Sequence, residues 1–236
     1  MKKILIIILV SLTIYTYAQE KKTYIGLSMG ASIPVGDFAS KNLDNTSAGF
    51  ATTSSSFNLS FASKLGDGNF GLAGMIYSHF YDIDDNIWAT AIATKEQTPS
   101  EVRWSVLNNG SWSVMGLMLG GFSSFPLSEK VSFDTRLMLG MGQTTSPEVA
   151  IRRSSPSESI WVKQSSASAI ALSYSVGLGF RFNINDKISI LTNIDYFGTN
   201  PSFNTELIDS KGKKEIKNFS YSLSSINPTV GIAIGL

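Results

Sequence analysis

Residues 169–197 read AIALSYSVGLGFRFNINDKISILTNIDYF, and this stretch decides the fold. In its first half every second residue is large and apolar, while the residues between are small or polar. The apolar set is Ile170, Leu172, Tyr174, Val176, Leu178, Phe180, Phe182 and Ile184. Strict alternation with a period of two predicts a β-strand with one apolar face. The turn residues Asn185, Asp186 and Lys187 follow, and the alternation then resumes from Ile188 to Tyr196, so the stretch predicts a long antiparallel hairpin.

The second face of this hairpin decides which side is inside. It consists of Gly, Ala and Ser with scattered charge, whereas the solvent face of a soluble barrel would be rich in Lys, Glu and Thr. Small residues suit the crowded interior of a narrow barrel, so we predict a membrane-spanning β-barrel with its apolar face toward lipid. The alternative is a soluble periplasmic lipid carrier with the two faces inverted.

The first residues predict export. Lys2 and Lys3 precede an apolar run at 4–14, and Thr16-Tyr17-Ala18 places small residues where a signal peptidase reads them. We expect residues 1–18 to be a signal peptide and residues 19–236 to form a single barrel domain. No later apolar run reaches the length of a transmembrane helix, and the absence of cysteine excludes disulfides.

Similar alternation recurs along the rest of the chain. It marks further strands at 24–34, up to 65, 70–81, 111–122, 131–142 and 227–236. Together with the hairpin these make eight strands, so the predicted fold class is an all-β, eight-stranded antiparallel up-and-down transmembrane β-barrel. The strand at 111–122 is apolar on both faces, which leaves its phase open.

The connections between these strands alternate in length. Short turns are expected near 66–69, 126–130 and 185–187, and long polar loops near 36–49, 83–110, 143–166 and 198–222. Even-stranded barrels of the outer membrane have short periplasmic turns and long external loops. We therefore expect both ends of the barrel domain to lie on the periplasmic side.

Composition excludes several other functions. The formal net charge of the whole chain is +1, which gives no indication of nucleic-acid binding. One histidine and no cysteine argue against a zinc site, and no glycine-rich phosphate-binding motif is present. We expect no cofactor and no metal.

Few charged side chains are predicted to face the lumen. They are Lys64, Asp134, Arg136, Arg181 and Asp195. Polar groups inside a narrow barrel must satisfy one another, so we predict that Asp134, Arg136, Arg181 and Asp195 form a structural ion-pair network. The alternative is that these charges line the constriction of a small pore.

His79 is the only histidine and is expected to face the lumen. Nucleophilic catalysis would need a serine within hydrogen-bonding reach of it. Ser78 points to the opposite face, and the same-face neighbours Tyr77 and Tyr81 are not serines, although a serine on another strand stays open. We expect ordinary hydrogen bonds at His79 and no enzymatic activity.

The segment DIDDN at 82–86 resembles the opening of a calcium-binding loop. The rest of that motif is missing, because Ile87 stands where glycine is needed and Ala93 where a bidentate glutamate is needed. A solvated acidic loop is the better interpretation.

Basic side chains gather in two of the expected external loops. They are Arg152, Arg153, Lys211, Lys213, Lys214 and Lys217. Arginine and lysine bind phosphate well, so the first five are candidate contacts for lipopolysaccharide phosphates. The alternative is a solvated loop surface, since Glu148, Glu158, Asp209 and Glu215 lie nearby.

A family resemblance adds to this interpretation. The opening YIGLSMGASIPVGDF at 24–38, the leader that ends before Gln19 and the alternating final strand resemble small outer-membrane β-barrel proteins of Bacteroidota, including PorT-like proteins, and more distantly the OmpA and OmpX barrels. The resemblance implies an integral outer-membrane protein, inserted by the barrel assembly machinery and in contact with lipid and lipopolysaccharide. We expect a monomer with a structural or loop-mediated binding or adhesion role. The alternatives are a narrow small-solute pore, a lipid-modifying enzyme and an accessory factor of a secretion or gliding machinery.

Overall fold

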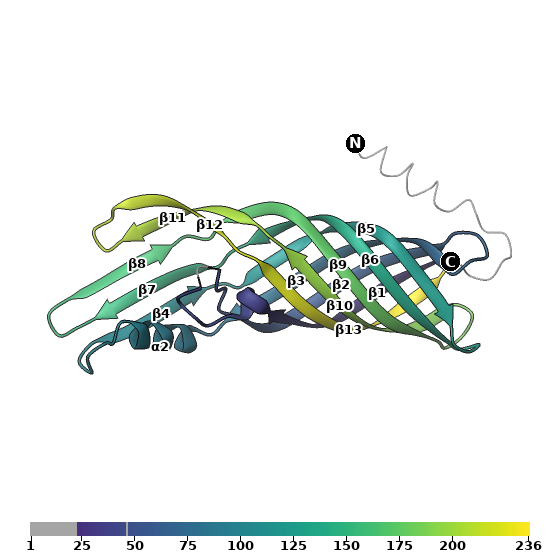
Figure 1. Ribbon diagram of the computed structural model, residues 1–236, viewed down its shortest axis with the longest axis horizontal. Helices are drawn as coiled ribbons and strands as arrows, with labels where there is room; N and C mark the ends of the chain where they lie inside the picture. Colours follow the sequence, from purple (N-terminus) through teal and green to yellow (C-terminus); the bar gives the residue numbers. More distant parts are fainter. Residues whose placement is uncertain (1–22, 46) are drawn as a thin grey trace.

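The structure is a computed structural model that describes residues 23–45 and 47–236, so the predicted signal peptide lies outside the described residues. Eight antiparallel strands close a barrel in the order β1-β13-β10-β9-β6-β5-β3-β2 (Figure 1). The barrel strands are β1 Thr23–Val35, β2 Ala51–Lys64, β3 Phe70–Ile83, β5 Trp112–Pro126, β6 Val131–Thr145, β9 Ser168–Asn183, β10 Ile188–Thr199 and β13 Leu223–Gly235. The predicted fold class is confirmed.

The apolar residues of the alternating pattern lie on the outside of this barrel. Leu119, Leu139 and Leu172 are among the most exposed, at 75%, 68% and 77%. A continuous apolar exterior is favourable in hydrocarbon and unfavourable in water, so the inverted soluble carrier is wrong. The structure also shows which face of the segment 111–122 is inside the barrel, because Trp112, Met118 and other even-numbered residues of β5 are buried in the lumen.

The described residues contain no helix with the length and apolar character needed to span a membrane.

Short turns at one end of the barrel join β2 to β3, β5 to β6 and β9 to β10, as predicted. We call this the turn end. The two ends of the barrel domain meet there, since the amide of Leu236 donates to the carbonyl of Thr23 over 3.0 Å and β1 pairs with β13.

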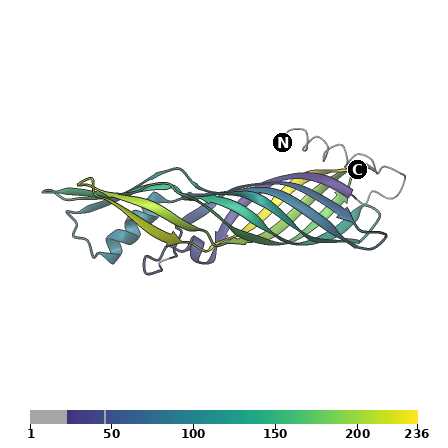
Figure 2. The ribbon, with the colours of Figure 1, turned by 90° about the horizontal axis from the view of Figure 1, so that it is seen from above.

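At the other end, five neighbouring barrel strands continue beyond the barrel as a second sheet, which we call the extension (Figures 1 and 2, left). Its strands are β4 Arg103–Asn109, β7 Glu148–Ser154, β8 Ser159–Gln164, β11 Ser202–Asp209 and β12 Lys214–Ser220. Their order β12-β11-β8-β7-β4 repeats that of the barrel strands they continue, β13-β10-β9-β6-β5. Each extension strand is therefore held beside its neighbour by the barrel pairing below it.

The extension corrects the prediction of long polar loops at 83–110, 143–166 and 198–222. These segments form strands and one helix, α2 Asp85–Lys95. They have little continuous apolar alternation, so the periodicity that predicts the barrel strands fails there. The predicted loop at 36–49 is confirmed as a connection between strands and contains the 3₁₀ helix η1 Gly36–Ala39.

Helix α2 explains the acidic run at 82–86. Asp84 caps the helix, because its carboxylate accepts hydrogen bonds from the amides of Asn86 and Ile87. Such a cap satisfies amides that have no partner within the helix. The helix then packs Ile92 against Val106 and Val149 of the extension. The acidic run is thus the start of a helix, and the prediction of a solvated loop there is wrong.

Candidate functional site

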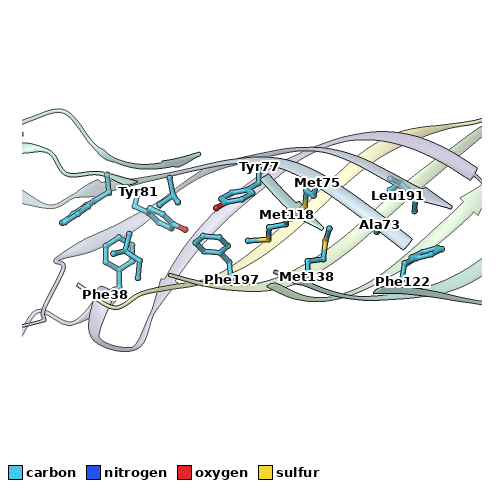
Figure 3. Packing of buried hydrophobic residues seen from close by; sticks show 14 of the residues in the cluster. Phe38, Ala73, Met75, Tyr77, Tyr81, Met118, Phe122, Met138, Leu191 and Phe197 are labelled. Carbon is cyan, nitrogen blue, oxygen red and sulfur yellow. The ribbon is translucent and has the colours of Figure 1, made fainter. Parts of the chain in front are cut away.

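The lumen is filled by large side chains along most of its length. Met75, Met118 and Met138 meet in its middle, and Tyr77 and Phe197 lie beside them on the side of the extension (Figure 3). All five are buried. This is the expected consequence of an eight-stranded barrel, whose interior is only wide enough for side chains.

An aromatic cluster closes the mouth of the barrel below the extension. Phe38 from η1 packs edge-on against Tyr81 and Trp112, with ring centroids 4.9 and 5.6 Å apart. Trp112 also packs against Phe203 and Tyr221. The connection between β1 and β2 therefore acts as a plug over the lumen.

Two titratable side chains near the mouth of the barrel, Lys41 and Tyr221, are affected by burial. The ammonium of Lys41 donates to the carbonyls of Phe50 and Ala51, each over 3.0 Å. Burial lowers the pKa of Lys41, and the nearby Asp84 carboxylate opposes that shift. Burial likewise raises the pKa of Tyr221, while a hydrogen bond with Gln164 lowers it.

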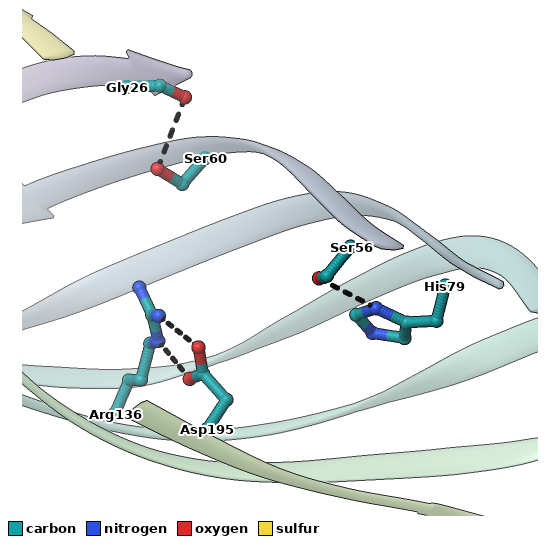
Figure 4. Close-up of polar contacts among 6 residues, drawn as sticks. All are labelled: Gly26, Ser56, Ser60, His79, Arg136 and Asp195. Carbon is teal, nitrogen blue, oxygen red and sulfur yellow. Dashed lines mark hydrogen bonds and ion pairs between the residues drawn. The ribbon is translucent and has the colours of Figure 1, made fainter. Parts of the chain in front are cut away.

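The predicted lumenal charges form two ion pairs. Arg136 on β6 and Asp195 on β10 make a bidentate contact, in which Arg136 Nε donates to Asp195 Oδ1 over 2.7 Å and Nη2 donates to Oδ2 (Figure 4). Both side chains are largely buried. A buried bidentate pair compensates two charges and fixes their geometry.

Gly177 on β9 makes this pair geometrically feasible. It is the register partner of both Arg136 and Asp195, so the arginine crosses over the intervening strand at the glycine. A Cβ at this position would overlap the Asp195 carboxylate and the Arg136 side chain. The sequence suggested only that the small residues of this strand suit a crowded lumen, whereas the structure shows which two side chains need the space at Gly177.

The second pair lies nearer the turn end. Arg181 Nε donates to Asp134 Oδ2 over 3.2 Å, and its Nη2 donates to Ser124 Oγ over 2.8 Å. The guanidinium also lies 5.1 Å from the ring centroid of Tyr24, which adds a cation–π contact. Together these contacts form the inner wall of an open vestibule.

This vestibule has a volume of about 790 Å³ and opens at the turn end. Lys64 lies in its wall, so this predicted inward charge is outside both ion pairs. The charged lining residues are of both signs: Lys64, Asp67, Glu129, Lys130, Arg181, Asp186 and Lys187. Mixed charge of this kind does not select one sign of ligand.

His79 has a serine partner that the sequence left open. Ser56 Oγ on β2 lies 2.9 Å from His79 Nδ1 (Figure 4). The pair is sealed, since Ser56 and His79 are 0% and 2% exposed and the imidazole packs against Tyr77 and Phe197. No carboxylate among residues 23–45 and 47–236 forms an ion pair with His79.

The extension has two unlike faces. On its inner face, continuous with the lumen, α2 covers β4 and β7. Its outer face presents basic and aromatic side chains. Five of them form what we call the outer-face patch: Arg103, Arg152, Trp161, Lys163 and Lys214.

Strand register places all members of the outer-face patch on one face of the sheet and makes two of them direct neighbours. Arg152 lies directly across from Trp161 and donates from Nε to Ser159 Oγ over 2.9 Å. Lys163 and Lys214 are paired with Glu148 and Glu206. Within the part of the chain that the structure describes, Arg103 and Arg152 have no carboxylate partner, so the patch keeps excess positive charge.

The predicted phosphate contacts are therefore divided by the fold. Arg152 and Lys214 belong to the outer-face patch, Arg153 and Lys217 lie on the inner face, and Lys211 and Lys213 lie in the turn between β11 and β12. Sequence reasoning missed Arg103, Trp161 and Lys163. Alternation in the short run SIWVKQ is the signal that could have placed Trp161 and Lys163 on one face, opposite Ile160 and Val162.

Similarity to known proteins is found among solved structures alone. No family model matches the chain, and no curated protein matches it. Among solved structures it is similar to the attachment invasion locus protein Ail of Yersinia pestis (14% identity, 90% of this chain and 98% of that chain, TM-score 0.40). It is also similar to Neisserial surface protein A (9%, 91% and 97%, 0.45) and a major outer membrane protein of Thermus thermophilus (10%, 90% and 98%, 0.47).

Closure of the eight strands and the apolar exterior define the class of protein. It is a transmembrane β-barrel of the outer-membrane type. Sequence identities of 9–14% assign no particular function to this chain.

Proposed function

We propose that this protein is a non-enzymatic integral outer-membrane protein whose closed barrel displays the extension as a binding or adhesion surface. The observation that carries the proposal is the contrast between the two parts. The lumen is filled and its mouth is plugged, while five strands continue as an ordered sheet with exposed side chains on its outer face. A rigid sheet presents side chains in a fixed arrangement, which favours recognition over transport.

In this proposal the extension lies on the cell-surface side of the outer membrane. The opposite end has short turns and holds both ends of the barrel domain, the arrangement of the periplasmic side in outer-membrane barrels. The outer-face patch then lies at the level of the lipopolysaccharide headgroups. Arginine and lysine match phosphate, and an indole ring suits a polar interface, so lipopolysaccharide is the first partner we propose.

The absence of catalysis is also part of the proposal. A Ser–His pair can act only on a substrate that reaches it. Ser56 and His79 are sealed beneath the aromatic cluster and among lumenal side chains. We therefore assign this pair a structural role, in which each polar group satisfies the other.

Membrane insertion and closure are tested on the intact protein. Cell fractionation should place it in outer membranes, and unboiled protein should migrate differently from boiled protein on a gel. In planar bilayers the inserted protein should give no conductance above background. A soluble protein without a mobility shift contradicts the barrel, and steady conductance supports the alternative of a small-solute pore.

The lipopolysaccharide contact needs a matched pair of variants. Arg152→Ser removes a charge from the outer-face patch, while Arg153→Ser removes the same charge from the inner face one residue away. Binding of fluorescent lipopolysaccharide to the refolded protein should weaken severalfold for Arg152→Ser and stay unchanged for Arg153→Ser. Equal effects of the two variants would show general charge attraction and contradict a contact at the patch.

A further inference from the structure

The free edge of the extension is the strand β12. In the described sheet β12 pairs with β11 on one side and lies at the end of the strand order. The amide of Tyr221 donates to Pro201, and the amide of Asp209 donates to Lys213, which fixes the hydrogen-bonding phase of this strand pair. Odd-numbered residues of β12 therefore bond to β11, and the N–H and C=O groups of Lys214, Ile216 and Asn218 point to the open edge.

Such an edge can accept another strand. Ile216 is 75% exposed on it, and Glu215 and Lys217 flank Ile216 on the opposite face of the sheet. Their side chains approach to 3.7 Å and both stay about half exposed. The edge thus combines unpaired backbone groups, one exposed apolar side chain and, on the face opposite Ile216, one charge of each sign.

We propose that this edge pairs antiparallel with β12 of a second copy of the chain, with Ile216 opposite Ile216. In this register the free N–H and C=O groups of the two Ile216 residues bond to each other, and those of Lys214 meet those of Asn218. Glu215 of each copy lies opposite Lys217 of the other. The contact therefore contains two opposite-charge cross-strand pairs, which stabilise a sheet.

Charge also disfavours the neighbouring registers. The same outward-pointing backbone groups could also pair if the two-fold axis passed at residue 215 or at residue 217 instead of at Ile216. One shift places Glu215 opposite Glu215, and the other places Lys217 opposite Lys217. Like charges directly opposite each other destabilise a strand pair. Lysine on an edge strand usually blocks unwanted pairing, and here the block is relieved in one register.

Geometry then fixes where the second copy is. Two identical strand edges related by a two-fold axis pair antiparallel, because parallel pairing needs an offset that such symmetry does not provide. In this chain β12 runs from the tip of the extension toward the barrel (Figure 1). The partner's β12 runs the other way, so its barrel lies in a facing membrane. The contact joins two membranes and is compatible with a monomer within each one.

This inference rests on the proposed display of the extension outside the membrane, and it names the partner of an adhesion role. A single contact along seven residues is small compared with stable interfaces. Many copies on two facing surfaces would act together, and the combined attachment then exceeds that of one pair by orders of magnitude. Vesicles that carry many copies are therefore the right object for the test.

The experiment uses full-length protein folded into two populations of phosphatidylcholine vesicles with different lipid dyes. Protease accessibility establishes that the extension is outside, and gel mobility establishes folding. Wild-type vesicles should attach to one another and not to protein-free vesicles. Lys217→Glu and Glu215→Lys should each reduce attachment at least tenfold within their own population. A mixture of these two populations should attach to each other, because every cross-strand pair is then Glu opposite Lys.

Two further variants separate edge pairing from misfolding and from general charge. Ile216→Pro removes an N–H that points away from β11, so the strand stays paired and attachment is lost. Lys211→Glu makes the same charge change in the adjacent turn and should leave attachment unchanged. Folded, outward-facing wild-type protein that gives no attachment, equal attachment to protein-free vesicles, or no rescue in the mixed populations would overturn the proposal. Failure of the gel shift itself would instead contradict the proposed barrel.

Discussion

Removing the carboxylate of Asp195 should strongly lower the free energy of unfolding of the barrel. Asp195 accepts two hydrogen bonds from Arg136 in a buried bidentate contact. Asp195→Ala would leave a largely buried guanidinium without its counter-charge. Breaking one side of a buried ion pair costs about 3–5 kcal/mol, and two charge-assisted hydrogen bonds at about 1.5–3 kcal/mol each give a similar value.

The assay is unfolding by guanidinium chloride of the protein in lipid vesicles, with the folded fraction read from the gel mobility of unboiled protein. Asp186→Ala is the matched control, because Asp186 lies exposed in the turn between β9 and β10; its effect should stay within about 0.5 kcal/mol. The double variant Arg136→Met/Asp195→Leu removes both charges and should recover most of the loss. A loss below about 1 kcal/mol for Asp195→Ala, with an unchanged denaturant dependence, would refute the reasoning.

Three other substitutions follow from the same structure. Gly177→Ala should cost about 1–3 kcal/mol in the same unfolding assay, because the added methyl group displaces the Asp195 carboxylate; wild-type stability would contradict this. Leu139→Arg on the lipid-facing side should cost about 2–4 kcal/mol in vesicles, and no loss there would place Leu139 away from hydrocarbon. Asp84→Ala should weaken α2 by about 1 kcal/mol, seen as faster amide exchange confined to residues 85–95, and unchanged exchange would show that packing alone holds the helix.

The filled lumen and the ordered extension leave the outer face of the extension as the accessible polar surface of this protein. Phe38 and Trp112 close the mouth, and Arg103 and Arg152 carry the unpaired charge of the outer face. In the proposed orientation the barrel anchors the extension outside the membrane and holds its outer face accessible. The outer-face patch and the β12 edge are separate parts of that sheet, so their contacts can be tested independently.

Local periodicity determined most of the barrel. In the hairpin at 169–197, and in strands such as β6, the side of each residue follows from its position in the sequence because side chains alternate along a strand. The same alternation predicted that Asp134 and Arg181 face the lumen, and the structure brings them into contact. The glycines between large residues indicated a narrow lumen, and Gly177 lies where that space is needed.

Only the tertiary structure showed that the extension continues the barrel and which side chains are in contact inside the lumen. The strands of the extension are short and are aligned by neighbours far away in the sequence, so alternation could place Trp161 and Lys163 on the same face but could not show that this face is the outer one. The pairing of Ser56 with His79, and of Arg136 with Asp195 across Gly177, depends on the register of several strands at once. A sequence specifies alternation locally, but closure and register are set by every strand together.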